Sequence, residues 1–100
     1  CERALLIDPQ GIEVMNRLAW LYAKKRTKID RGLGLIKTVN KMQPNSPKYI
    51  DTFSELLFAK GDVTGAIKNI KDAIRLDPDN QYYKQQMRRF EAFSSDSFDD

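Results

Sequence analysis

Two carboxylates, Asp51 and Glu55, are the residues of this sequence best spaced to do chemistry together, because they stand four positions apart. In a helix this spacing puts both side chains on one face, as paired-carboxylate general acid–base catalysis requires. Nothing in the sequence supplies a deep apolar pocket, a set of oxyanion donors or a cluster of metal ligands beside them. We therefore interpret the pair as part of a solvated helix surface.

The rest of the sequence excludes most catalytic machinery. It contains no histidine, which removes imidazole acid–base chemistry, histidine metal ligands and Ser-His-Asp or Cys-His nucleophiles. Its single cysteine, Cys1, rules out an internal disulfide and a cysteine-rich zinc site. None of the glycines, Gly32, Gly34 and Gly65 included, stands directly before the Lys-Ser/Thr pair that ends a phosphate-binding loop. We predict that the chain is not an enzyme and has no catalytic residues, metal site or cofactor.

The composition is that of one folded domain. Of 100 residues, 41% are hydrophobic and 31% are charged, a mixture too apolar for a disordered chain and ordinary for a globular one. No segment approaches the ~20 consecutive apolar residues that a membrane-spanning helix needs, so we predict no membrane insertion.

Basic residues gather in the first half of the chain. Residues 1–46 hold nine Lys or Arg against four Asp or Glu, whereas residues 94–100 hold three Asp and no base. The excess is densest over 24–28, a run that could meet phosphate. We interpret it as a solvated turn, because a net charge of +3 is modest and the aromatic residues are not spaced as a stacking platform. Nucleic-acid binding is the less favoured alternative, and we predict no nucleic-acid partner.

An internal repeat is the strongest signal in the sequence. Pro9, Pro44 and Pro78 are 35 and 34 residues apart. The positions five and eight residues before each proline are small or apolar in all three copies: Ala4, Val39 and Ala73, then Cys1, Ile36 and Ile70. Such periods of 20–50 residues indicate stacked structural repeats.

Each repeat contains two stretches with helical spacing. Apolar residues recur at offsets of 3, 4 and 7, which puts them on one helix face. We expect helices over the ranges 1–7, 12–25, 29–42, 47–60, 63–76 and 81–93. Ser46-Pro47 is a helix start, Gly61 a helix end, and Asp62 a cap for the next helix.

The pattern resembles the tetratricopeptide repeat, a helix–turn–helix unit of about 34 residues with the signature W-x2-L-G-x2-Y, then A-x3-F, then P. The second unit carries the signature as Ile50, Phe53, Ser54, Leu57, Ala66, Ile70 and Pro78, and the first as Met15, Leu18, Ala19, Tyr22, Gly32, Ile36 and Pro44. The first unit departs at its turn, residues 24–28, which has one residue more and no glycine. The resemblance implies an all-α, tetratricopeptide-type right-handed solenoid of helical hairpins, ending in a C-terminal capping helix.

The resemblance also implies a layout. The repeat domain is expected over 1–93, as a partial repeat 1–11, repeats 12–46 and 47–80 and a capping helix 81–93, followed by an acidic disordered tail, 94–100. Arg88 stands where a further unit would need a small residue, which favours a cap. Because the sequence begins with Cys1 inside a half repeat, we expect a C-terminal fragment of a larger protein, with an exposed N-terminal face through which it could form a homodimer.

In tetratricopeptide arrays the first helix of each unit lines a concave groove, where partners bind. Carried over residue by residue, this groove would be lined by Asn16, Trp20, Lys48, Asp51, Glu55, Phe58, Tyr82, Gln85 and Arg89. Two interpretations of Trp20 stay open: packing against neighbouring helices, which is favoured, or anchoring a partner. The lysine and asparagine clamp that some members use for a peptide carboxylate is not recognisable. We expect a scaffold that binds a protein or peptide partner; a regulatory or oligomerising appendage of a larger enzyme is the alternative.

Overall fold

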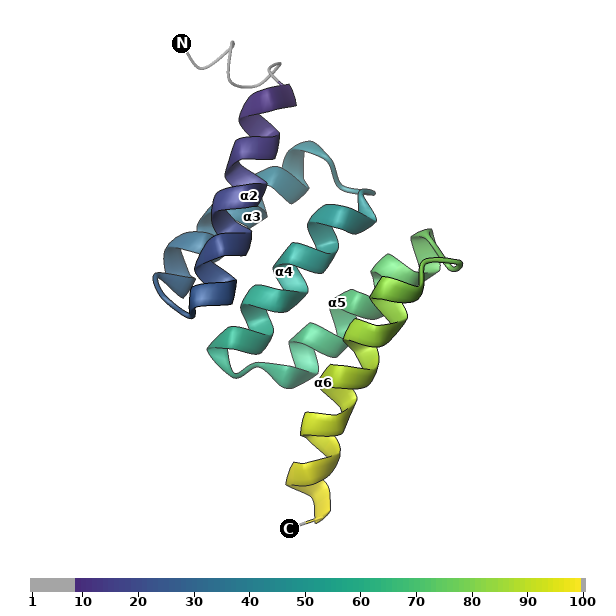
Figure 1. Ribbon diagram of the computed structural model, residues 1–100. Helices are drawn as coiled ribbons and strands as arrows, with labels where there is room; N and C mark the ends of the chain where they lie inside the picture. The colour runs from purple at the N-terminus through teal and green to yellow at the C-terminus, as the bar shows by residue number, and fades with distance from the viewer. Residues whose placement is uncertain (1–8, 100) are drawn as a thin grey trace.

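The computed structural model describes residues 9–99, and in this range the chain forms five helices and no strand (Figure 1). The helices are α2 (Pro9–Lys25), α3 (Ile29–Met42), α4 (Pro47–Lys60), α5 (Val63–Leu76) and α6 (Gln81–Asp99). The predicted all-helical class is therefore confirmed for this part of the chain. The helix expected over 1–7, with most of the partial repeat 1–11, lies outside the described residues.

Local signals set the bounds of α3, α4 and α5, which are those expected from the sequence. Pro47 occupies the first turn of α4, where its missing N–H group costs nothing. Gly61 ends α4 with φ of 103°, a left-handed conformation that glycine adopts without strain. The side chain of Asp62 then caps α5 by accepting the backbone N–H of Gly65 at 2.9 Å.

The turns inside the two hairpins close with the same backbone hydrogen bonds. The donor–acceptor pairs are Arg26 to Ala23 and Thr27 to Tyr22 in the first turn, and Gly61 to Phe58 and Asp62 to Leu57 in the second. Arg26 therefore takes the place of Gly61 in the left-handed conformation, with φ of 54°. The extra residue of the first turn is accommodated by Lys28, which is also left-handed, with φ of 51°.

The turns that follow α3 and α5 also share one geometry. Gln43 and Asp77 have φ of −130° and −141° and the same ψ of 72°, and each donates its N–H to the carbonyl four residues back. Pro44 and Pro78 follow these two residues directly. Neither helix continues past this point, since a proline cannot continue a helix. Pro9 is the first residue of α2, three positions before the helix start expected at 12, and its fixed φ suits a helix start.

The last helix is longer than predicted. α6 runs to Asp99, six residues past the expected end at Phe93. No glycine or proline interrupts the sequence between 81 and 99, and serine and aspartate lower helix propensity only modestly. The acidic composition alone therefore does not end the helix.

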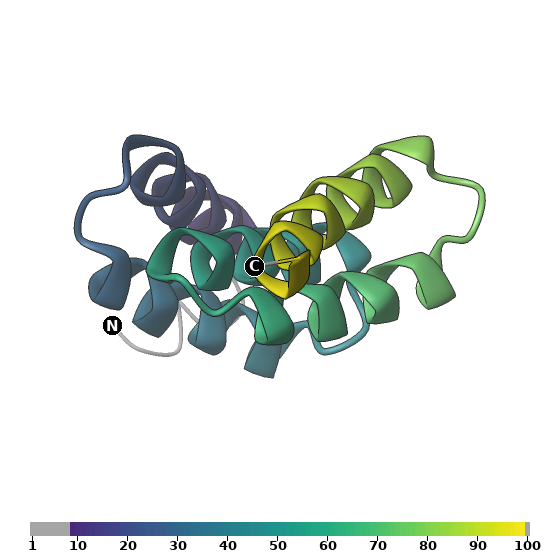
Figure 2. The same ribbon diagram turned by 90° about the horizontal axis from the view of Figure 1, so that it is seen from below.

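The helices lie in two layers. α2, α4 and α6 form one layer, α3 and α5 form the other, and α2 and α6 rise on either side of α4 (Figures 1 and 2). α4 packs against α2, α3 and α5, while α6 packs against α5. The central helix thus holds the two hairpins together, and its face in the first layer lies between α2 and α6.

The core consists of two apolar clusters joined at α4, with Leu57 in contact with both. Small residues permit the close helix approaches: Ala19 and Ala66 are fully buried, and a Cβ on Gly32 would lie 2.8 Å from Cδ2 of Leu56. In α6, Phe90 is fully buried in the second cluster.

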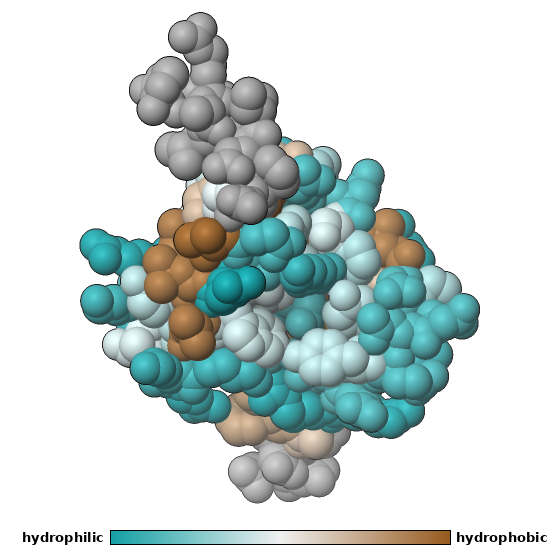
Figure 3. Space-filling view, turned by 45° about the horizontal axis from the view of Figure 1, so that its top comes forward, coloured by the Kyte–Doolittle hydropathy of each residue, from teal (hydrophilic) through white to brown (hydrophobic). Residues whose placement is uncertain are grey.

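One predicted core residue is outside the core. Leu18, expected in the buried stripe of α2, is 38% exposed, and Val14 and Leu21 are 60% and 45% exposed beside it. With Arg17 they line a shallow apolar surface, which contributes to the brown patch over α2 in Figure 3.

Candidate functional site

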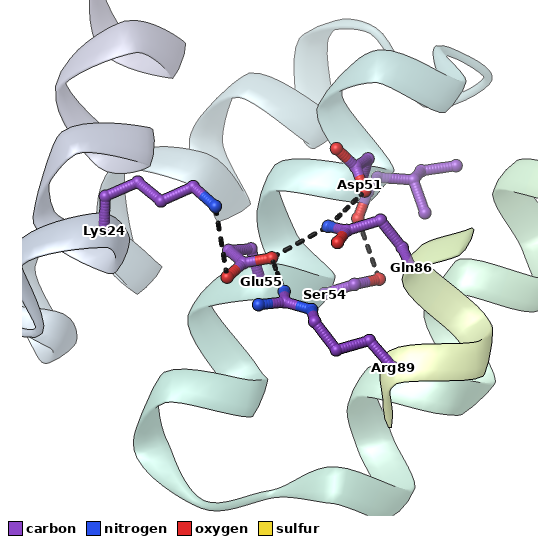
Figure 4. Close-up of polar contacts among 7 residues, drawn as sticks. Lys24, Asp51, Ser54, Glu55, Gln86 and Arg89 are labelled. Carbon is purple, nitrogen blue, oxygen red and sulfur yellow. Dashed lines mark hydrogen bonds and ion pairs between the residues drawn. The ribbon is translucent and has the colours of Figure 1, made fainter. Parts of the chain in front are cut away.

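The face of α4 that carries Asp51 and Glu55 is buried. Both side chains are 5% exposed, and Thr52 between them is 2% exposed. The interpretation of the carboxylate pair as a solvated surface is therefore wrong. The cause is tertiary: α2 and α6 approach from either side, and their polar side chains cover this face of α4 (Figure 4).

Glu55 joins three helices. Gln86 of α6 donates an amide N–H to Glu55 Oε1 at 2.8 Å, and Arg89 of α6 pairs with the same oxygen. Lys24 of α2 lies 3.8 Å from the other oxygen, Oε2 (Figure 4). Burial by itself would raise the pKa of Glu55, but the hydrogen bonds from Arg89 and Gln86 and the nearby positive charges hold that pKa below its usual value.

Asp51 has a different environment. It accepts one hydrogen bond, from Nε2 of Gln86 to Oδ1 at 3.2 Å, and no lysine or arginine of the described residues forms an ion pair with it. Burial, with the charge of Glu55, raises the pKa of Asp51 to about 6, against the hydrogen bond from Gln86. The pKa values of two carboxyl groups four residues apart are thus shifted in opposite directions: that of Asp51 is raised and that of Glu55 is lowered.

A hollow opens above Asp51, between α2, α4 and α6. Its volume is about 280 Å³, just below the ~300–1,000 Å³ typical of small-molecule sites. Its lining is Glu13, Asn16, Arg17, Trp20, Lys48, Asp51, Thr52 and Tyr82. The size suits one side chain of a partner better than a cofactor.

A polar latch between α2 and α4 forms one wall of the hollow. Lys48 Nζ lies 2.9 Å from both carboxylate oxygens of Glu13, and the hydroxyl of Tyr49 donates to Glu13 Oε2 at 2.8 Å. These bonds, from Lys48 first, lower the pKa of Glu13, while burial and the hydrogen bond to Glu13 raise the pKa of Tyr49 to about 12. The latch fixes the register of α2 on α4 beside the hollow.

Asn16, Trp20 and Tyr82 complete the lining. Asn16 is 7% exposed, and its Oδ1 has no hydrogen-bond partner. Trp20 is half-buried, with Lys24 Nζ 4.6 Å from its ring centroid, so it both packs and lines the hollow. Burial, then the charges of Asp51 and Glu55, raise the pKa of Tyr82 to about 12. The two interpretations of Trp20, packing and anchoring a partner, both stay open.

Eight of the nine groove candidates lie in three places, and the ninth, Gln85, lies in none of them. Asn16, Trp20, Lys48, Asp51 and Tyr82 meet around the hollow, and Glu55 and Arg89 pair next to it. Phe58 stacks on Phe90, with ring centroids 4.7 Å apart, and the guanidinium of Arg89 lies 5.0 Å from the Phe58 ring. Gln85 is exposed, does not line the hollow and takes no part in these contacts.

Sequence reasoning missed Gln86, which holds both carboxylates. Measured from Tyr82, Gln85 is at offset 3 and Gln86 at offset 4, and both offsets fall on one face of a helix. Both glutamines also keep helical spacing to Arg89, at offsets of 4 and 3, so the sequence carries no signal that separates Gln86 from Gln85.

Within the residues that the structure describes, no group of three or more Cys, Asp or Glu side chains is arranged to hold a metal ion. None of the described helices is long and apolar enough to cross a membrane. No protein-family model matches the chain, and no curated protein matches its sequence significantly. The site must therefore be interpreted from its own geometry.

Proposed function

We propose that the chain is a tetratricopeptide-type right-handed solenoid of two helical hairpins, with α6 as the capping helix. Four features support this: the 35- and 34-residue spacing, the shared turn geometry at Gln43 and Asp77, the matching hydrogen bonds at Arg26 and Gly61, and the two-layer arrangement. The exposed side chain of Arg88 suits the role of α6 as the end of the stack.

We propose further that this array is a protein–protein interaction scaffold that binds a peptide or helix against α2, α4 and α6. The observation that carries the proposal is the hollow of about 280 Å³, because side chains from all three helices meet there and Trp20 lines it. Half-exposed tryptophans in such hollows are typical binding anchors. Binding is by surface complementarity, with no catalytic step and no cofactor. Nucleic-acid binding is disfavoured, because Lys24 of the basic turn is directed toward Glu55 and Trp20.

Selection of random peptides tests the proposal. A display library of random 12-residue peptides is panned on the full chain, and the affinities of the enriched peptides are measured by fluorescence polarisation. Trp20→Ala should weaken them at least about tenfold, which corresponds to ~1.4 kcal/mol. Leu21→Ala is the matched control, because Leu21 is the next residue of α2 and lines a different surface.

The control should keep affinities within about twofold of the unchanged chain, and circular dichroism should show both variants folded. If no peptide is enriched, or if both variants weaken binding equally, the groove assignment is wrong.

Self-association is the second candidate, and would make the chain an oligomerising appendage. The observation that favours it is the exposed apolar surface of Val14, Leu18 and Leu21 on α2. Sedimentation at rising concentration should then show a dimer that Leu18→Glu returns to monomer, with Lys37→Glu on α3 as the control. A monomer at every concentration would exclude this role.

A further inference from the structure

We propose that the hollow seats a single basic side chain, an arginine or lysine, of the bound peptide. This inference rests on the proposed function, because that function supplies the peptide. The preference of the hollow for a basic side chain can be measured separately, with short probes.

The lining of the hollow includes a buried carboxylate that has no ion-pair partner among the described residues. Asp51 is 5% exposed and accepts one hydrogen bond, from Gln86. Glu55, one turn later on the same helix, has Arg89 and Lys24 as ion-pair partners, but no cation of the described residues pairs with Asp51. Burying a carboxylate without a cation is unfavourable, and an entering ammonium or guanidinium group would supply the missing charge.

A second acceptor in the lining lacks a partner. Asn16 lines the hollow and is only 7% exposed. Its Oδ1 atom is buried and accepts no hydrogen bond. A buried acceptor without a donor is costly. Guanidinium carries five N–H donors and ammonium three, with no acceptor on either, so a basic side chain can donate to Asn16 and Asp51 together. A carboxylate offers no donor to either.

The aromatic lining fits the same ligand. Trp20 and Tyr82 both line the hollow, and aromatic faces attract cations. Trp20 already does so, with Lys24 Nζ 4.6 Å from its ring centroid. The aromatic rings would also contact the aliphatic stem of an arginine or lysine.

The rim limits how basic the peptide can be. Arg17 and Lys48 are exposed residues of the lining, and Lys48 is paired with Glu13 at 2.9 Å. With Glu13, these residues leave a net positive charge at the mouth, while acceptors lie inside. The arrangement selects one basic side chain flanked by neutral or acidic residues over a run of basic residues.

The test compares charged probes with neutral isosteres on the full chain. The probes are acetyl-Gly-Arg-Gly-amide and the same peptide with citrulline for arginine, followed by lysine and Nε-acetyl-lysine versions. Binding is read from NMR shifts of the Trp20 indole N–H and the Asn16 side-chain amide. A single anchor should bind with a Kd on the order of 1 mM, and the neutral isosteres at least about tenfold more weakly.

Asp51→Asn should remove the preference for arginine over citrulline, because it removes the charge and keeps an acceptor. Equal binding of arginine and citrulline to the unchanged chain, or tighter binding of an acetyl-Gly-Glu-Gly-amide probe, would overturn the inference. Selected peptides that depend on Trp20 but carry no basic residue would overturn the inference while leaving the proposed function intact. Arginine-selective shifts at the hollow without any enriched peptide would support the inference and contradict the peptide scaffold.

Discussion

Replacing Arg89 with alanine is expected to lower the free energy of unfolding by about 2–3 kcal/mol. The change leaves the buried carboxylate of Glu55 without its closest cation, and breaking a buried ion pair in this way typically costs ~3–5 kcal/mol. We take a smaller figure because the Arg89 side chain is 43% exposed and Lys24 and Gln86 still contact Glu55. Urea unfolding followed by circular dichroism measures the change.

Arg88→Ala is the matched control for this prediction. It removes the same charge one position earlier on α6, from an exposed side chain, and should change the stability by no more than about 0.5 kcal/mol. Equal losses in the two variants would mean that Arg89 acts through helix propensity or net charge, and that α6 does not hold Glu55.

Asp51→Asn is expected to stabilise the chain at neutral pH. Burial raises the pKa of Asp51 from 3.8 to about 6, so between these values the folded chain binds more protons at this site than the unfolded chain. Stability therefore falls as pH rises through this window, and the full cost is present above about pH 6. Asparagine keeps the acceptor for Gln86 but carries no charge, so the gain at pH 7 should be on the order of 2 kcal/mol.

The gain should disappear below about pH 3, where the aspartic acid side chain is largely neutral in both the folded and the unfolded chain. Glu55 has the opposite effect. Its pKa is lowered in the folded chain, so it stabilises the fold at neutral pH, and this stabilisation is lost on acidification. Comparing the variant with the unchanged chain at each pH cancels this contribution. Thermal unfolding over pH 3–8 measures the difference, with the exposed Asp79→Asn as control. A variant that is less stable at pH 7 would contradict the assignment.

The helices were predictable because their signals are local. Pro47 at a first turn, Gly61 at a helix end and Asp62 as a cap fix the bounds of α4 and α5 regardless of what packs on them. The end of α6 carries no such signal, since neither glycine nor proline stops it before Asp99. Its length therefore could not be derived from the composition of the tail.

The state of the carboxylates could not be derived from their spacing. Asp51 and Glu55 lie off the apolar stripe of α4, so periodicity places them on the surface. They are buried because α2 and α6, from positions up to 35 residues away, bring Lys24, Gln86 and Arg89 over them. Five of the nine nominated groove residues do meet at the hollow, because residues on one face of adjacent helices meet once those helices pack side by side.

α2 and α6 converge on α4 and take two carboxylates out of water in different ways. NMR titration of the Asp51 and Glu55 side-chain carboxyl carbons in the ¹³C-labelled chain measures both environments. We expect a pKa of about 6 for Asp51 and a pKa below 4.5 for Glu55. Two carboxyl groups that titrate together near pH 4, as solvated side chains do, would contradict it.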